Sequence, residues 1–405
     1  MKCKIRRVTV IFMVLCISSC ILLNNSPHDD SSIELTFETG INNGEIYYSW
    51  TDAKLTEDVK YTLLILKGWH RSKEVIAKGN SIDISTDVHS GTFIGEAGEW
   101  YSAVILAENK LDRMYSYLKR AMAKNDGNIP SYSILYQLPD AGPSQMMGYL
   151  IKTGNGKIIA IDGGTRYDSA QMVELIKAGK ENGHVDAWFI THPHIDHIGV
   201  LMEVLENYHE INIVHIYSSL FDQDIYKRNE PNSIAAGDNF PLFMDPIKNI
   251  YTELSIGDIF QFDDVTLEVL AVKNPEITSN LVNNSSCCFK LYTEDVSVLF
   301  LGDMGVEAGR KLLNHYKSTG TLKSDIVQMA HHGQNGVEKN VYEEIAPKIA
   351  LWPTPEWLWN NQPSGKEPNT GPWLTLVVRR WMEELGVQSF VGYEGFIEIK
   401  LKTAE

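Results

Sequence analysis

The chain has 405 residues, of which 43% are hydrophobic and 22% are charged, and its formal net charge is −16 at pH 7. This length allows two domains with separate cores, and this composition excludes a disordered or fibrous protein. The acidic balance argues against a polyanionic partner such as nucleic acid.

The first 20 residues have the pattern of an export signal. The short apolar run Val8 to Ile17 cannot span a bilayer, and it follows four basic residues, Lys2, Lys4, Arg6 and Arg7. The ending Ile17-Ser18-Ser19-Cys20 resembles the bacterial lipobox, in which the cysteine is acylated and becomes the mature N-terminus. An ordinary signal peptide and an uncleaved anchor are the alternatives. We therefore expect a bacterial, extracytoplasmic protein that is held at the membrane by a lipid on Cys20, or secreted.

A small β-sandwich is predicted for residues 33–109, after a polar segment at residues 21–32 that suits a tether. Short β-type runs alternate with turn residues here, namely Ile33 to Phe37, Glu45 to Trp50, Tyr61 to Leu66, Ser81 to Ser85 and Trp100 to Ala107. Three of them resemble core strands of a fibronectin type III or related immunoglobulin-like domain. We expect a spacer or a partner-docking module, because nothing in this region suggests chemistry.

Residues 110–130 are expected to form a connecting helix and a linker. The apolar residues recur at helical spacing, at Leu111, Met114, Tyr115, Leu118 and Met122. The helix should end before the turn-forming residues Asp126 to Pro130.

From residue 131 to the end, strand-like and helix-like segments alternate, which predicts an α/β layered domain. The expected strands are Ile158 to Ile161, Val185 to Ile190, Ile213 to Tyr217, Thr266 to Val272, Val296 to Leu301, Ile326 to Ala330 and Ile349 to Trp352. The expected helices are Ser169 to Ala178, Val200 to Tyr208, Gly305 to Tyr316 and Trp373 to Leu385. Cys287 and Cys288 are neighbours on one expected strand, so we interpret them as small core residues on opposite faces and not as a disulfide framework.

A metal site is predicted at Thr191 to Gly199, which follows an apolar run. On an extended segment His192 and His194 share one face and can hold one ion. Asp196 and His197 lie where the chain should turn into a helix that begins near Gly199, so they can serve a second ion close by. Imidazole and carboxylate ligands suit Zn²⁺ or another first-row ion. A solvated, histidine-rich loop without metal is the alternative.

Other expected strands also end in potential ligands. Asp162, Asp303 and the pair His331-His332 each follow an apolar run directly or within a few residues. Because strand ends in an α/β layer gather at one edge, these side chains should converge there.

The order of these potential ligands resembles the metallo-β-lactamase fold superfamily. The matching residues are Asp162-Gly163-Gly164, then His192, His194, Asp196 and His197, then Gly302-Asp303 and finally His331-His332-Gly333. The resemblance covers residues 131–405 and implies an αββα sandwich. Within the superfamily, Asn283-Asn284-Ser285-Ser286 and His331-His332-Gly333 resemble the hydrolase domain of the bacterial competence protein ComEC and the phosphodiesterases of bacterial surfaces.

The resemblance implies two divalent metal ions, zinc or manganese, that share a hydroxide as nucleophile. His192 and His194 would hold the first ion, Asp196, His197 and His331 would hold the second, and Asp303 would bridge them. Asp162 would orient the ligands from behind. Asp196 and His332 are the candidate catalytic residues, and His332 either contacts substrate or the leaving group or packs against its loop.

One departure from the family concerns the third histidine that many members supply to the first ion. The interval before Asp303 contains only His209 and His215, and both are expected to be structural. Asn283 or Asn284 is the candidate for the vacated place, directly or through water, which would leave the first site weaker or partly empty.

A tryptophan-rich loop follows the expected strand at residues 349–352. Trp352, Trp357 and Trp359 could stack on a sugar ring or cage a quaternary ammonium group, although aromatic clusters of this kind also occur in cores.

The resulting hypothesis is an exported metal-dependent hydrolase of phosphoester bonds in a small molecule or a cell-envelope component. Removing residues 1–19 takes away four positive charges and no acidic ones, so the net charge falls from −16 to −20. This charge disfavours an extracellular nuclease like the ComEC domain, which is the nearest competing hypothesis. A lactone or β-lactam hydrolase and a non-catalytic surface binding protein rank below it, and the sequence does not indicate an oligomeric state.

Overall fold

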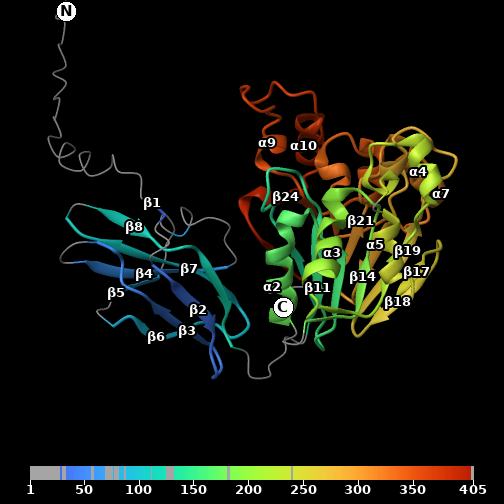
Figure 1. The fold of residues 1–405 in the computed structure, drawn as a ribbon. Helices are drawn as coiled ribbons and strands as arrows, with labels where there is room; N and C mark the ends of the chain where they lie inside the picture. Colours follow the sequence, from blue (N-terminus) through green and yellow to red (C-terminus); the bar gives the residue numbers. More distant parts are fainter. Residues whose placement is uncertain are drawn as a thin grey trace, which may run out of the picture. The chain divides into compact units, whose positions relative to one another are not determined.

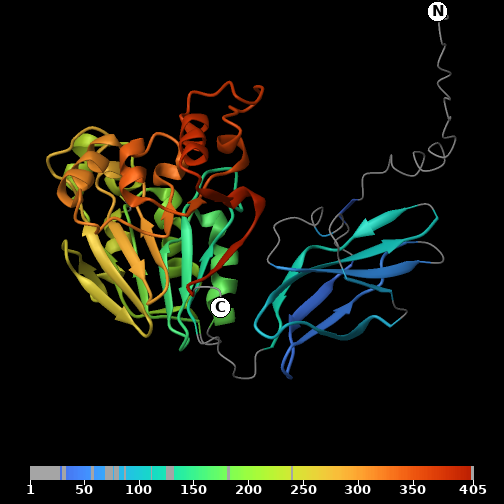
Figure 2. The ribbon, with the colours of Figure 1, turned by 180° about the vertical axis from the view of Figure 1, so that it is seen from behind.

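The computed structural model describes residues 28–29, 33–55, 59–68, 76, 82–85, 88–110, 112–124, 132–179, 183–238 and 240–402. The chain divides into two compact units, Met1–Asp126 and Gly127–Glu405. Figures 1 and 2 show them as a β-rich unit and a larger unit of strands and helices. The expected export signal and Cys20 lie outside the described residues. No helix within the described ranges has the length and apolar character that a membrane crossing needs.

The N-terminal unit is a sandwich of two β-sheets. The larger sheet has the order β1-β8-β7-β4-β5, with β9 also paired to β7, and consists of β1 (His28–Asp29), β4 (Lys60–Lys67), β5 (Ile82–Ser85), β7 (Trp100–Glu108), β8 (Arg113–Tyr115) and β9 (Lys119–Met122). The smaller sheet, β2-β3-β6, consists of β2 (Leu35–Thr39), β3 (Glu45–Trp50) and β6 (Ser90–Ile94). Trp50, Leu63 and Ile105 are among the side chains of both sheets that share one core.

The expected connecting helix at residues 110–130 is wrong, because this segment forms β8 and β9 in the larger sheet. Both strands pair antiparallel with β7. Tyr115 and Ala121 are buried there, so pairing with an open strand edge outweighs the helical spacing of the apolar residues. Part of the expected tether at residues 21–32 also belongs to the larger sheet, because His28 and Asp29 form β1 and pair with β8.

The C-terminal unit contains two seven-stranded sheets. The first, β17-β16-β14-β12-β11-β10-β25, consists of β10 (Ile134–Gln137), β11 (Gly148–Lys152), β12 (Ile158–Asp162), β14 (Ala187–Phe189), β16 (Ile216–Ser218), β17 (Tyr251–Glu253) and β25 (Ile397–Lys400). The second, β18-β19-β20-β21-β22-β23-β24, consists of β18 (Ile259–Phe262), β19 (Val265–Ala271), β20 (Cys288–Tyr292), β21 (Ser297–Phe300), β22 (Ile326–Gln328), β23 (Ile349–Trp352) and β24 (Gln388–Val391). The short strands β13 (His184–Val185) and β15 (Asn212–Ile213) pair separately.

Helices cover the outer faces of the two sheets (Figure 1). The helices α2 (Ser169–Gly179) and α3 (Ile195–Asn207) pack on the first sheet, whereas α7 (Val306–Tyr316), α8 (Lys339–Ile345) and α10 (Thr375–Glu384) share a core with the second. The remaining short helices are η1 (Arg166–Asp168), α4 (Gln223–Asn229), η2 (Ile234–Ala236), α5 (Phe240–Ile247), α6 (Leu281–Asn284), η3 (Ala330–Gly333), α9 (Glu356–Trp359) and η4 (Gly392–Glu394). The expected αββα sandwich is therefore confirmed.

A buried core joins the inner faces of the two sheets. Phe189 of β14 and Phe289 of β20 meet there with ring centroids 5.5 Å apart. Cys287 belongs to this inner core, and Cys288 belongs to the core under the outer helices. Both thiols are free and buried, which confirms their interpretation as small core residues.

Parallel strands in each sheet bring the chemically important segments to one edge. Strands β12, β14 and β16 run parallel in the first sheet, and β21, β22 and β23 run parallel in the second. Asp162 ends β12, and His192, Asp303 and His331 follow β14, β21 and β22. The carboxyl ends of these strands therefore hold the candidate site.

Candidate metal centre

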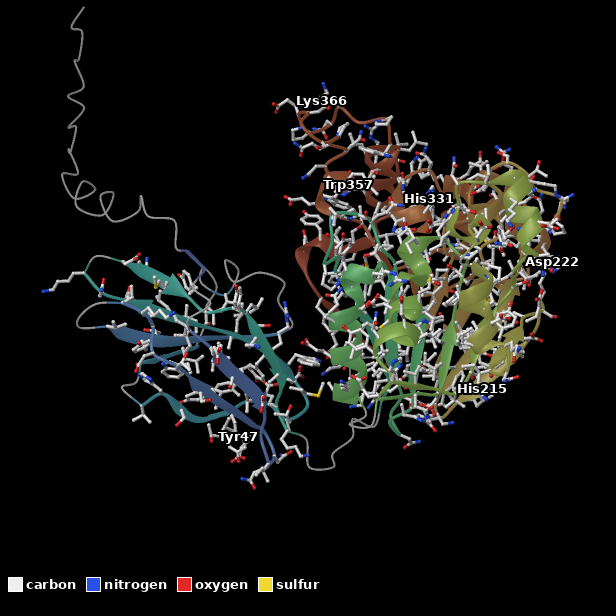
Figure 3. The ribbon with its side chains drawn as sticks, in the orientation of Figure 1. Tyr47, His215, Asp222, His331, Trp357 and Lys366 are labelled. Atoms are coloured by element: carbon white, nitrogen blue, oxygen red, sulfur yellow. The ribbon has the colours of Figure 1, made fainter. Side chains whose placement is uncertain are left out.

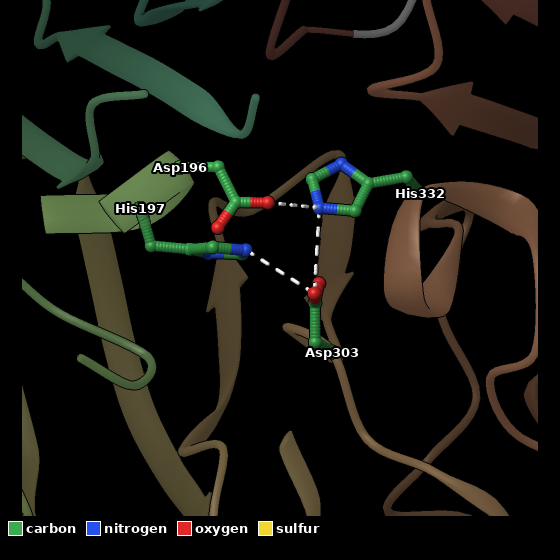
Figure 4. Close-up of side chains that lie close together, drawn as sticks. All are labelled: Asp196, His197, Asp303 and His332. Atoms are coloured by element: carbon green, nitrogen blue, oxygen red, sulfur yellow. Dashed lines mark ion pairs between the residues drawn. The ribbon is translucent and has the colours of Figure 1, made fainter. Parts of the chain in front are cut away.

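Four side chains converge at this edge: Asp196, His197, Asp303 and His332, whose potential ligand atoms all lie within 4.8 Å of one another. His332 Nε2 lies 3.2 Å from Asp196 Oδ2 and 3.3 Å from Asp303 Oδ2. His197 Nε2 lies 3.3 Å from the same Asp303 oxygen. Figure 4 shows these contacts, which join the start of α3 to the segments after β21 and β22.

The chemistry of this cluster fits a divalent cation. Asp303 Oδ1 is buried without a hydrogen-bond partner, and His197 Nε2 and His332 Nε2 are buried with carboxylate oxygens at 3.2 to 3.3 Å beside them. Leaving a buried oxygen such as Asp303 Oδ1 unsatisfied costs about 1 to 3 kcal/mol, and more for a charged group. Two imidazole nitrogens and carboxylate oxygens that point into one space form a ligand set for zinc or a similar first-row ion.

The first turn of α3 positions Asp196 and His197. The helix begins at Ile195 with His194 as its N-cap, so the expected start near Gly199 is wrong. Gly199 allows this earlier start, because a Cβ there would lie 2.8 Å from the backbone of Thr165. Its missing side chain lets the helix approach the chain after β12.

A second pair of imidazoles lies next to this cluster. His192 Nε2 is 3.1 Å from His194 Nδ1 and 3.9 Å from Asp303 Oδ2. The other nitrogen of His194, Nε2, faces Glu230 Oε2 at 3.4 Å. Glu230 follows α4 and also accepts a hydrogen bond from the Val282 amide at 2.8 Å. It was not found from the sequence, because the segment between β16 and β17 has no recognisable ligand pattern.

Asp162 has the orienting position expected for it. Its carboxylate is buried and accepts hydrogen bonds from His197 Nδ1, the Thr191 amide and the Thr191 hydroxyl, each at 2.7 Å. Thr191 Oγ1 in turn lies 3.1 Å from His192 Nδ1. One carboxylate thus fixes His197 directly and His192 through a threonine, and leaves Nε2 of both rings directed at Asp303.

The adjacent histidines differ from the expectation. His332, and not His331, joins Asp196 and His197, and its Nδ1 donates a hydrogen bond to the Pro353 carbonyl at 2.8 Å. Because Nε2 faces the two carboxylates and the side chain is fully buried, this position does not fit a residue that protonates a leaving group. His331 Nε2 lies farther from Asp303 Oδ2, at 3.8 Å, and 3.3 Å from Asn283 Nδ2.

Burial and opposite charges set the protonation of the metal-free cluster. Burial would lower the pKa of His332, but Asp303 and Asp196 raise it to about 9. The pKa of His197 is also raised, because Asp303 and Asp162 outweigh burial. Burial would raise the pKa of Asp196, but His332 and His197 hold it below its usual range. By contrast, burial and two neighbouring imidazoles keep the pKa of His192 well below its ordinary value.

Of the two asparagines, only Asn283 lies beside the site. Asn284 faces α7, where its Oδ1 accepts hydrogen bonds from the amides of Gly305 and Ala308 at 3.1 and 3.2 Å. It caps a helix and is not near the ligands, so its expected place there is wrong. Ser286, two residues later, has an additional role, because its Oγ accepts the Asp303 amide at 3.0 Å and lies 3.3 Å from His192 Nδ1.

The three tryptophans do not form a cage. Trp352 is fully buried in the core under the outer helices, so its expected contact with a substrate is wrong. The Trp359 ring is covered by the Arg379 guanidinium, 4.0 Å from the ring centroid. Trp357 (Figure 3) pairs with Trp373 at 4.9 Å. Each of the three rings therefore packs against other side chains of the protein.

An open cavity of about 540 Å³ lies beside His194 and Asp196. The segment between β16 and β17 forms its other wall, from Asn229 to Ile234. Behind it, Gln145 donates a hydrogen bond to Asp196 Oδ2 at 3.1 Å and accepts one from Gln334 at 2.9 Å. A larger cavity, of about 620 Å³, lies along α7 and is not lined by any of the ligands.

A family model agrees with this fold. The family model of the metallo-beta-lactamase superfamily matches residues 141–351, whereas no curated protein matches the chain. Among solved structures, the metallo-beta-lactamase fold protein YhfI from Bacillus subtilis is 12% identical, with 66% of this chain and 99% of that chain covered and a TM-score of 0.39. Yeast PDE1 is also 12% identical, with the same coverage and a TM-score of 0.42. Since the family model matches more than half of the sequence, the chain belongs to the metallo-β-lactamase superfamily of hydrolases.

Proposed function

We propose that the protein is an exported hydrolase of phosphoester bonds that uses two divalent cations. The observation that supports this most directly is the position of Asp303 Oδ2. Four imidazole nitrogens surround it: those of His197 and His332 at 3.3 Å each, and those of His331 and His192 at 3.8 and 3.9 Å. One carboxylate oxygen with imidazoles on several sides is suited to bridge two ions.

Each group of residues has a distinct task in this proposal. Asp196, His197 and His332 would hold one cation, zinc or manganese, and His192 and His194 would hold the other. Such a pair supplies Lewis-acid charge at the attacked phosphorus and lowers the pKa of a water. Asp162 orients His197 from behind, and Glu230 orients His194 from the wall of the cavity.

The cavity beside the ligands restricts the class of substrate. Its lining contains the carboxylates of Asp196 and Glu230 and no lysine or arginine. A nucleic-acid strand needs cationic side chains along its backbone. This lining therefore favours a small or terminal phosphoester over a nucleic acid, and it agrees with the acidity of the whole chain.

We also propose that the protein acts outside the cytoplasm, anchored through a lipid on Cys20. The basic and apolar pattern of residues 1–20 supports this proposal. The β-sandwich would then act as a spacer or docking module between the membrane and the hydrolase unit.

The test measures hydrolysis before and after removal of metal with a strong chelator. Substrates should include a chromogenic phosphodiester, a phosphomonoester, a lactone and single-stranded DNA. We expect phosphoester turnover to disappear on chelation and to return with Zn²⁺ or Mn²⁺. Asp303→Asn should abolish turnover, and His215→Gln, at an exposed position on the opposite end of β16, should leave it unchanged. Full turnover by metal-free protein, or faster cleavage of DNA or of the lactone, would overturn the proposal.

A further inference from the structure

We propose that His331 completes the ligand set of the first cation, together with His192, His194 and Asp303. The two neighbouring histidines would then serve different ions, with His332 in the second set. This inference rests on the two-cation centre of the proposed function. It assigns to His331 the place for which the sequence offered only an asparagine.

The distances to Asp303 support this assignment. His331 Nε2 and His192 Nε2 lie 3.8 and 3.9 Å from the same oxygen, Asp303 Oδ2. His192 Nε2 is also 3.1 Å from His194 Nδ1. Nitrogen and oxygen ligands that share one ion at roughly 2.0 to 2.2 Å are separated by about 3 to 4 Å. His331 Nε2 thus lies at nearly the same distance from Asp303 Oδ2 as His192 Nε2, a proposed ligand of the first cation.

The backbone explains how two adjacent imidazoles reach different sides of one carboxylate. His331 and His332 both have left-handed conformations, with φ of 52° and 54°, and Gly333 follows with φ of 76°. This turn separates the two ring centroids by 6.2 Å. Each ring has a backbone carbonyl at Nδ1, that of Asn335 at 3.4 Å for His331 and that of Pro353 at 2.8 Å for His332. Both rings therefore direct Nε2 at Asp303, as metal-binding histidines do.

An unsatisfied amide oxygen supports a bound group on the His331 side. Asn283 is buried, its Nδ2 lies 3.3 Å from His331 Nε2, and its Oδ1 has no hydrogen-bond partner. An oxygen left in this state is costly unless something binds beside it. A cation with water ligands at His331 would lie next to this side chain, and such a ligand would satisfy the oxygen.

The other histidines that could supply the third imidazole are in the wrong place. His209 and His215 are both exposed. His215 precedes β16, whose carboxyl end faces the site, so it lies at the opposite end of that strand. Figure 3 shows His215 and His331, which adjoin strands of different sheets, well separated from each other.

The test counts cobalt ions bound per chain by absorption titration and elemental analysis, so that it does not depend on turnover. His331→Gly removes the imidazole and tolerates the positive φ. His331→Gly/His332→Gly removes one ligand from each proposed set. His194→Gly/His331→Gly removes two ligands from the first set only, and glycine is accepted at the N-cap that His194 occupies. Circular dichroism and urea unfolding verify that each variant is folded, and His215→Gln is the matched control.

We expect two cobalt ions in the native protein and in the control. His331→Gly should bind one ion as before and the other at least about tenfold more weakly, and added imidazole should restore the second ion. His194→Gly/His331→Gly should keep one ion, and His331→Gly/His332→Gly should weaken both. A His331→Gly protein that binds two ions with native affinities would overturn the inference alone. So would a His331→Gly/His332→Gly protein that keeps one ion at native affinity. A native protein that binds a single ion would overturn the two-cation centre as well.

Discussion

Replacing Asp162 by asparagine should weaken metal binding in a protein that still folds. The carboxylate makes three hydrogen bonds of 2.7 Å, to the Thr191 amide, the Thr191 hydroxyl and His197 Nδ1. The Thr191 amide can only donate, so the asparagine oxygen must stay opposite it. The new NH₂ group then faces His197 Nδ1 and donates to it. This reverses the tautomer and puts a proton on Nε2, the atom that should bind metal.

The magnitudes follow from these contacts. Loss of an outer-sphere partner typically weakens metal binding about 10 to 100-fold, which corresponds to about 1.4 to 2.7 kcal/mol. The lost charge-assisted hydrogen bond should lower the free energy of unfolding of the metal-free protein by about 1.5 to 3 kcal/mol.

The assay is zinc competition against a chromophoric chelator, combined with urea unfolding of the metal-free protein. Asp325→Asn is the matched control, because Asp325 also accepts hydrogen bonds from a backbone amide and a hydroxyl, those of Ser297 at 3.1 and 2.9 Å. Asp325 precedes β22 and is at the end of the strand away from the ligands. Its replacement should reduce stability and leave zinc affinity unchanged. Native zinc affinity in folded Asp162→Asn would refute the orienting role.

Three further outcomes are expected. Glu230→Gln should weaken one of the two metal-binding phases about tenfold or less and spare the other, because His194 is the one proposed ligand that Glu230 contacts. Equal weakening of both phases in a cobalt titration would contradict this. Zinc uptake at pH 7 should release up to about two protons and should strengthen as the pH rises towards 9, because His332, with its pKa raised to about 9, and His197 carry protons that the metal must displace. Calorimetry in buffers of different ionisation enthalpy measures this release, and uptake without protons would be inconsistent with the charged cluster. Trp352→Ala should lower the free energy of unfolding by about 3 to 5 kcal/mol, whereas the half-buried Trp357→Ala should cost clearly less; similar losses from both in urea would show that the loop packing is misassigned.

The convergence of the site could be predicted from the sequence, because it depends on topology alone. Once Asp162, His192, Asp303 and the histidine pair each follow an apolar strand, parallel pairing brings them to one edge. The sequence motif and the order of the strands then suffice to predict which of these side chains meet.

What could not be predicted depends on local backbone geometry and on distant segments. Whether His331 or His332 joins Asp196 is decided by three consecutive left-handed residues, which spacing does not reveal. Glu230 reaches His194 from the segment between β16 and β17, so only the folded chain brings them together. Trp352 is aromatic and adjacent to the site in sequence, but strand packing buries it. The helical spacing from Leu111 to Met122 was overridden because β7 offered strand edges to pair with.

Anomalous diffraction at the zinc edge, from crystals of protein loaded with zinc, tests the central claim most directly. We expect a peak that is bonded to Asp196, His197, Asp303 and His332, and a second peak on the other side of Asp303 beside His192 and His194. Zinc found elsewhere, or no peak among these side chains at full metal loading, would contradict the metal centre on which the proposed hydrolase depends.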